Sequence, residues 1–126
     1  MSREWVVGID LGGTKTALGL IGPENHVVAR CRMPTHAHQG LQAVVERIAQ
    51  AVTDLQRQIP DRARVSAVGI CSPGPVDHRS GMLLDPPNLP ALHNTPLRHA
   101  LSDRLELPVT LEHDAKAAAL GEYHYG

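Results

Sequence analysis

The chain has 126 residues, of which 42% are hydrophobic and 20% are charged. These proportions are typical of a folded domain with its own core, and they exclude intrinsic disorder. One Trp, two Tyr and no Phe cannot build the stacking platforms that hold single-stranded nucleic acid. Twelve basic residues against thirteen acidic ones leave a net charge of -1, which argues against a general DNA- or RNA-binding surface.

Membrane and disulfide patterns are also missing from the sequence. No apolar run approaches the ~18 residues of a membrane span, and no basic segment followed by an apolar one marks a secretory signal at the N-terminus. The two cysteines, Cys31 and Cys71, are too few for a disulfide framework. We therefore expect a cytoplasmic protein with neither a membrane nor a nucleic acid as partner.

The first third of the chain predicts three strands. Residues 5–9 form a short apolar, β-branched run, and residues 16–21 and 27–33 follow the same pattern. Each connection is short and carries turn residues such as glycine, proline and asparagine. Short connections join antiparallel strands, so the chain is expected to open as a three-stranded meander.

The rest of the chain predicts helices that alternate with strands. Apolar residues from Leu41 follow the i, i+3, i+4, i+7 pattern of a helix that ends before Pro60. Residues 65–70 predict a fourth strand. Thr95 is predicted to cap a short helix that has Pro96 in its first position. That helix extends to residue 105.

A fifth strand at residues 109–111 and a helix from Asp114 complete the pattern. The order β-β-β-α-β-α-β-α predicts an α/β fold with a mixed five-stranded sheet and helices packed on it. The last helix reaches Gly126 with no closing turn. We therefore expect residues 1–126 to be one lobe of a longer protein.

The sharpest motif is the segment DLGGTKT at residues 10–16. Two glycines in a tight turn between strands let backbone N–H groups approach an anion. A carboxylate at the end of a strand can hold Mg²⁺ through water. The segment is neither a Walker A loop nor a dinucleotide fingerprint, because the glycine spacing of both is absent. A plain hairpin turn remains the alternative interpretation.

Two further segments carry polar residues after predicted strands. Residues 72–77 (SPGPVD) and 87–90 (PNLP) would form rigid loops, and an amide such as that of Asn88 can bind a sugar hydroxyl. Asp114 lies where a helix is expected to begin. It is therefore either a helix cap or a general base facing a substrate hydroxyl.

Taken together, these motifs resemble the ROK family (repressors, open reading frames, kinases), which includes bacterial glucokinases and N-acetylhexosamine kinases. The resemblance covers essentially the whole chain and rests on four segments in order: DxGGT at 10–14, PGPVD at 73–77, NLP at 88–90 and ExDAxAAALGE at 112–122. It implies the N-terminal lobe of a two-lobed kinase with the actin-like, ribonuclease H-like ATPase fold. The implied activity is ATP-dependent phosphorylation of a hexose or N-acetylhexosamine.

The resemblance also implies roles for particular residues. Asp114 matches the catalytic base, Asp10 matches a residue near the Mg²⁺ ion, and Gly74 and Asn88 match positions that contact the hexose. The ATP phosphates would lie at the turn that contains Gly12, Gly13, Thr14 and Lys15. Where the family usually has Asn before the catalytic Asp, this chain has His113, which puts the identity of the sugar in doubt.

Several family features fall outside these 126 residues. A cysteine-rich structural zinc motif and most of the adenosine pocket belong to a second lobe, so this chain alone is expected to be inactive. The resemblance also implies a homodimer for the full-length protein. A sugar-sensing transcriptional regulator, or a sugar-binding protein without catalysis, remains the alternative. A regulator of this family carries a DNA-binding domain before the lobe, and here the first strand begins within a few residues of Met1.

Overall fold

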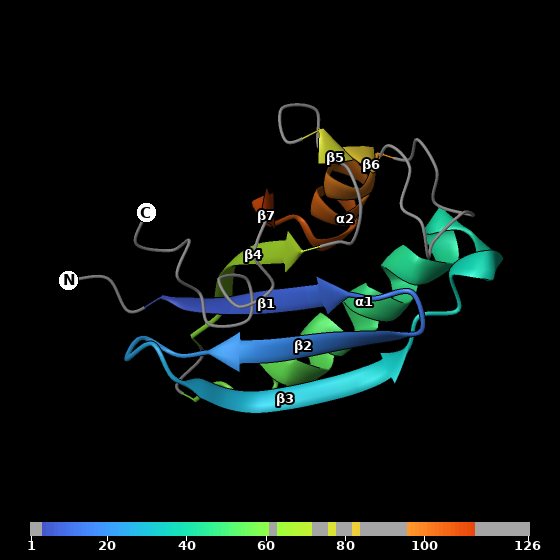
Figure 1. The fold of residues 1–126 in the computed structure, drawn as a ribbon. Helices are drawn as coiled ribbons and strands as arrows, with labels where there is room; N and C mark the ends of the chain where they lie inside the picture. The colour runs from blue at the N-terminus through green and yellow to red at the C-terminus, as the bar shows by residue number, and fades with distance from the viewer. Residues whose placement is uncertain (1–3, 61–62, 72–75, 78–81, 84–95, 113–126) are drawn as a thin grey trace.

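A computed structural model describes residues 4–60, 63–71, 76–77, 82–83 and 96–112. Its main feature is a five-stranded sheet in the order β3-β2-β1-β4-β7 (Figure 1). The pairs β1–β2 and β2–β3 are antiparallel, whereas β1–β4 and β4–β7 are parallel. The mixed sheet and the opening meander are thus confirmed. The five strands are β1 (Trp5–Leu11), β2 (Lys15–Ile21), β3 (Val27–Pro34), β4 (Val65–Cys71) and β7 (Val109–Glu112).

In the part of the chain that the structure describes, two α-helices lie on one face of this sheet. They are α1 (Leu41–Gln56) and α2 (Leu97–Leu105), and Figure 1 shows α1 behind the first three strands. Arg104 of α2 donates to Glu46 of α1 at 2.7 Å, which ties the helices together at the surface. No helix in the described part of the chain is long and apolar enough to cross a membrane.

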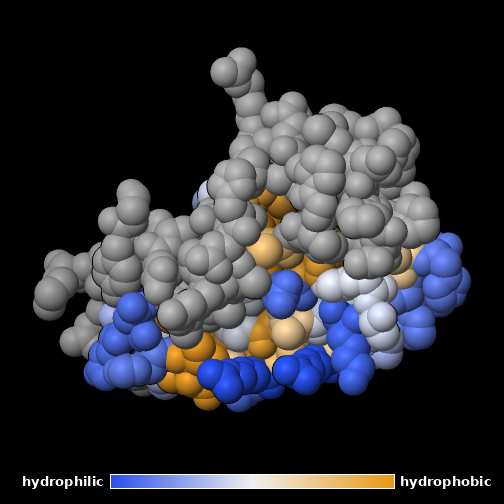
Figure 2. Space-filling model, in the orientation of Figure 1, coloured by the Kyte–Doolittle hydropathy of each residue, from blue (hydrophilic) through white to orange (hydrophobic). Residues whose placement is uncertain are grey.

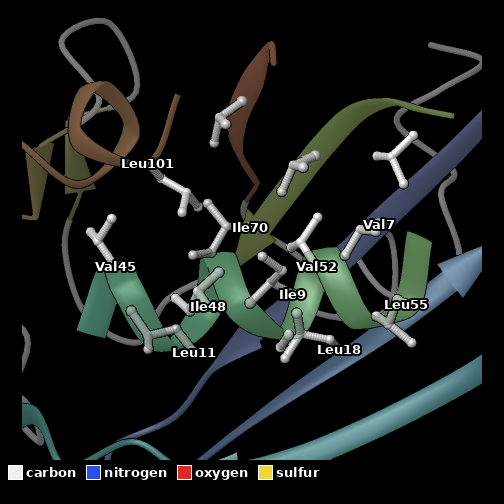
Figure 3. Packing of buried hydrophobic residues seen from close by; sticks show 14 of the residues in the cluster. Val7, Ile9, Leu11, Leu18, Val45, Ile48, Val52, Leu55, Ile70 and Leu101 are labelled. Carbon is white, nitrogen blue, oxygen red and sulfur yellow. The ribbon is translucent and has the colours of Figure 1, made fainter. Parts of the chain in front are cut away.

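The core forms where alternate strand residues meet the apolar face of α1. Val7, Ile9 and Leu11 of β1 are fully buried, because every second residue of a strand faces the same side. Ile48 and Val52 of α1 pack against them, as Figure 3 shows. Burying one such side chain stabilises the fold by about 2 kcal/mol. The helical periodicity from Leu41 therefore corresponds to a real buried face.

Some details differ from the sequence-based expectations. Pro96 is the N-cap of α2 and not its first helical residue, because its ψ of 68° is not helical. Between β3 and α1 the structure adds a short 3₁₀ helix, η1 (Ala37–Gln39), and it also adds a two-stranded sheet of β5 (Val76–Asp77) and β6 (Met82–Leu83). The last expected helix, from Asp114, lies outside the described residues.

Candidate functional site

The carboxyl ends of the three parallel strands meet at one edge of the sheet. Asp10 of β1 is in register with Cys71 of β4, which is in register with Glu112 of β7. The Asp10 side chain is exposed at this edge, whereas Cys71 is buried. Ligands of open α/β sheets bind beyond the carboxyl ends of such strands. Asp10 therefore occupies the expected edge for a ligand site.

The row of residues that contains Asp10 continues across the antiparallel strands. Asp10 is in register with Ala17, and Ala17 with Arg32 of β3. These residues alternate with core-facing ones, so they lie on the face of the sheet opposite α1. Arg30 and Arg32 are exposed there. Figure 2 views this face and shows a hydrophilic margin where β3 lies.

The turn between β1 and β2 requires glycine at its first position. The N–H of Gly12 donates to the carbonyl oxygen of Lys15 at 3.0 Å. A Cβ atom at Gly12 would lie 2.6 Å from that same oxygen, which is closer than real contacts allow. Neither Gly12 nor Gly13 is among the residues with positive φ, so this turn is not of the primed type that favours glycine in hairpins.

The backbone N–H groups of this turn differ in whether they have an acceptor. The Gly12 N–H donates to the Lys15 carbonyl oxygen inside the turn. For the N–H groups of Gly13 and Thr14, no acceptor is found within the described residues. Thr14 and Lys15 are exposed. Two successive N–H groups that no described residue accepts from, beside a lysine, offer the donors and the positive charge that a phosphate needs.

The turn is braced from outside by Thr35, which follows β3. The Thr35 hydroxyl donates to the Gly12 carbonyl oxygen at 2.8 Å, and the Thr35 N–H donates to the Thr14 carbonyl oxygen at 2.9 Å. The Thr16 hydroxyl lies 2.8 Å from the Thr35 hydroxyl. The Thr35 hydroxyl has one proton, which it donates to Gly12, so the Thr16 hydroxyl must be the donor to the Thr35 hydroxyl. Thr16 and Thr35 are each 1% exposed.

Arg47 of α1 holds Thr35 in turn. Its guanidinium donates to the carbonyl oxygen of Thr35 at 2.8 Å and to that of His36 at 3.3 Å. A further bond at 2.8 Å reaches the side-chain oxygen of Gln39. Helix α1 is thereby linked through Thr35 to the β1–β2 turn.

Neither cysteine thiol is an exposed group in the structure. Burial, with a smaller contribution from the nearby Asp54 carboxylate, raises the pKa of Cys31, so its thiol stays protonated at neutral pH. Cys71 is buried, as expected of a small hydrophobic residue. No cluster of three His, Cys, Asp or Glu side chains suited to a metal occurs in the described ranges.

The residues singled out from the sequence fall into two groups, and the structure describes one of them. Asp10, Gly12, Gly13, Thr14 and Lys15 lie in or beside one turn at the carboxyl edge of β1. The predicted sugar-binding residues and catalytic base lie outside the described residues: Gly74, Asn88, His113 and Asp114. Glu112, which directly precedes His113 in the sequence, is described, and it ends β7 at the same edge.

Sequence reasoning missed the residues that hold the turn. Thr35 lies 19 positions after Thr16 and 12 before Arg47, and a lone threonine in a polar loop carries no motif. The available signal was indirect: the two hairpins return residue 35 to the start of β2. Register counting along the meander would have found it.

Comparison with known proteins identifies the family of the chain. The family model described as "ROK family" matches residues 6–126. The chain belongs to the ROK family. It is 35% identical over its whole length to a glucokinase of Thermotoga maritima, and 38% identical over 93% of its length to an N-acetylmannosamine kinase of Escherichia fergusonii.

Solved structures of the family share the fold. A ROK hexokinase from Thermus thermophilus matches 95% of this chain with a TM-score of 0.78 at 38% identity. A ROK family glucokinase from Streptomyces griseus, in complex with glucose and AMPPNP, matches 97% with a TM-score of 0.76 at 34% identity. The actin-like ATPase fold expected from the resemblance is thus confirmed.

The chain spans only part of these relatives. It covers 38% of the Thermotoga glucokinase and 38% of the Escherichia kinase. A ROK family transcriptional regulator also matches, with a TM-score of 0.73 at 21% identity, which shows a shared fold alone. The matches named above at 34–38% identity are sugar kinases.

Proposed function

We propose that this chain is the N-terminal lobe of an ATP-dependent hexose kinase, and that it needs a second lobe to complete the ATP site. The observation that carries the proposal is the β1–β2 turn. There an exposed carboxylate, a lysine and two backbone N–H groups that have no acceptor among the described residues gather at the carboxyl edge of the sheet. The similarity of the chain to glucokinases supports the same conclusion.

In this proposal the turn receives the phosphates of ATP. The N–H groups of Gly13 and Thr14 would donate to phosphate oxygens, and the Lys15 ammonium would offset their charge. Asp10 would hold Mg²⁺ through water, and the ion would neutralise charge on the phosphates. Asp10 fits this role because its carboxylate is exposed beside the turn and is not consumed by a salt bridge among the described residues.

The sugar would bind at the same edge, next to the phosphates. Strand β7 ends there at Glu112, and Asp114 follows two residues later, a span of at most about 7 Å. As general base, Asp114 would accept the proton of a sugar hydroxyl as that oxygen attacks the γ-phosphoryl group and ADP leaves. Gly74, Asn88 and His113 would contact the hexose.

The kinase proposal is tested with the full-length protein and its Asp114→Asn variant. ADP release is measured against a panel that includes glucose, mannose and N-acetylmannosamine. We expect sugar-dependent turnover that falls by about three orders of magnitude in the variant, a size reached when a catalytic base is lost, while sugar binding by calorimetry persists. Near-normal turnover in the variant would remove Asp114 from the role of base.

The identity of the sugar has a separate test. His113 stands where the family usually has Asn, and an imidazole can make fewer hydrogen bonds than an amide. His113→Asn should therefore change the ratio of kcat/KM between hexose and N-acetylhexosamine. If no sugar of the panel gives turnover but a sugar still binds the wild-type protein, the sensor function replaces the kinase.

A homodimer and a structural zinc in the second lobe are further parts of the proposal.

A further inference from the structure

We propose that Thr35 is a positioning residue for nucleotide binding, because it fixes the β1–β2 turn in the shape that presents the N–H groups of Gly13 and Thr14. This inference rests on the proposed role of the turn in binding phosphate. Thr35 does not touch the nucleotide in this scheme. It acts through the two carbonyl groups that it holds, those of Gly12 and Thr14.

The geometry explains how one residue sets the turn. Thr35 donates one hydrogen bond from its side chain and one from its backbone, and they reach carbonyl groups on either side of Gly13. When a peptide carbonyl is held, the N–H of the same planar peptide is held with it. The Gly12 carbonyl shares its peptide with the Gly13 N–H. Thr35 therefore fixes one of the two proposed phosphate donors through a single covalent plane.

The burial of this link makes it sensitive to change. Thr35 and Thr16 are each 1% exposed, so water cannot replace a hydroxyl that is removed. The Gly12 carbonyl would lose the Thr35 donor, and the buried Thr16 hydroxyl would lose its acceptor. Hydrogen bonds in such a chain also strengthen one another.

The segment after Thr35 shows that the arrangement is held against backbone preference. His36 has φ 48° and ψ 47°, the left-handed region that non-glycine residues rarely adopt. Arg47 stabilises this segment by donating to the carbonyl groups of Thr35 and His36. Strain that persists beside a ligand site is typical of functional constraint.

The test uses the full-length protein with Thr35→Val, which keeps the shape and removes the hydroxyl, and Thr35→Ser, which restores it. AMPPNP affinity is measured by calorimetry, together with KM for ATP and for the sugar. In Thr35→Val we expect the AMPPNP Kd and the ATP KM to rise roughly tenfold, corresponding to about 1.4 kcal/mol, with the sugar KM unchanged. Thr35→Ser should return both to within about twofold of wild type.

Arg47→Met is a second test of the support for the turn, and it leaves the buried threonines unchanged. It should raise the AMPPNP Kd in the same direction by about threefold, since only the outer support of Thr35 is lost. Arg104→Met is the matched control. It removes an arginine–glutamate pair with Glu46, the neighbour of Arg47 on α1, and should leave the AMPPNP Kd unchanged.

The outcomes separate this inference from the proposed function. An unchanged AMPPNP Kd in Thr35→Val, even with a lower Tm, would show a purely structural role and overturn the inference. So would a Thr35→Ser variant as impaired as Thr35→Val. Wild-type protein that binds AMPPNP but phosphorylates no sugar would contradict the kinase, while the Kd series would still decide the role of Thr35. Wild-type protein that binds no AMPPNP would overturn both.

Discussion

The two turns at opposite ends of β2 are built in different ways. The β2–β3 turn closes on itself: Gly22 donates to His26 at 3.1 Å, and Asn25 donates to Gly22 at 2.9 Å. Asn25 supplies the left-handed residue, with φ 65°, which is ordinary hairpin chemistry. The β1–β2 turn has no left-handed residue and is held by Thr35 from beyond β3.

The difference shows which turn does more than reverse the chain. A turn that only joins two strands needs local bonds, and the β2–β3 turn has them. The β1–β2 turn leaves the N–H groups of Gly13 and Thr14 without protein acceptors in the described part of the chain and takes support from β3 and α1. External support with unpaired donors is expected where a ligand completes the hydrogen bonding.

Between these two turns, the largest effect is expected from adding one methyl group to the β1–β2 turn. In Gly12→Ala the new Cβ would meet the backbone oxygen of Lys15 at 2.6 Å, so the turn must change shape. We expect kcat/KM for ATP in the full-length protein to fall by about a hundredfold, equivalent to about 2.7 kcal/mol. Steady-state kinetics with varied ATP measures this.

Gly22→Ala is the matched control in the other turn. Its Cβ would meet the ring of Trp5 at 3.3 Å, and that half-buried side chain can move by a few tenths of an ångström. The ATP kinetics should stay at wild-type values. Equal losses in both variants would mean that the β1–β2 turn has no special relation to the nucleotide.

A smaller effect is expected from the carboxylate beside the first turn. Asp10 is exposed, so Asp10→Asn should fold normally but lose a charged partner for hydrated Mg²⁺. We expect kcat to fall about thirtyfold, within the range for a hydrogen bond to a charged group, and the Mg²⁺ concentration for half-maximal rate to rise. Glu24→Gln removes an exposed carboxylate from the β2–β3 turn and should change neither value. A normal Mg²⁺ titration in Asp10→Asn would exclude the metal role.

Hydrophobic periodicity predicted most of the described fold. Leu41 to Leu55 has its apolar residues on one helical face, and that face is buried against the sheet. Short connections predicted the antiparallel pairs. Periodicity could not find β5 and β6, because two-residue strands are too short to show a pattern. The predicted position of Pro96 in its helix was wrong by one residue. Proline was expected in the first helical position, where it is common, and it is the N-cap of α2.

The candidate site was predicted where its residues are adjacent in sequence. Asp10 to Lys15 form one motif, and the structure places them in one turn. Thr35 and Arg47 belong to the same site only through register and helix docking. Such long-range contacts leave no local pattern. Within the motif, the N–H of Gly12 is bound to the Lys15 carbonyl oxygen, a detail that only backbone geometry reveals.

The smallest effect is expected at Asn25, where the β2–β3 turn has its one conformational demand. Asn25→Ala places alanine, which adopts the left-handed region less readily than asparagine, at φ 65°. It should lower the free energy of unfolding by about 1 kcal/mol and the Tm of the full-length protein by about 2 °C. Asn25→Gly should stay close to wild type, because glycine adopts this conformation freely. Neither variant should alter the KM for ATP. A change in that KM would mean that the β2–β3 turn, too, is coupled to the nucleotide, and the contrast between a self-contained turn and a braced one would not hold.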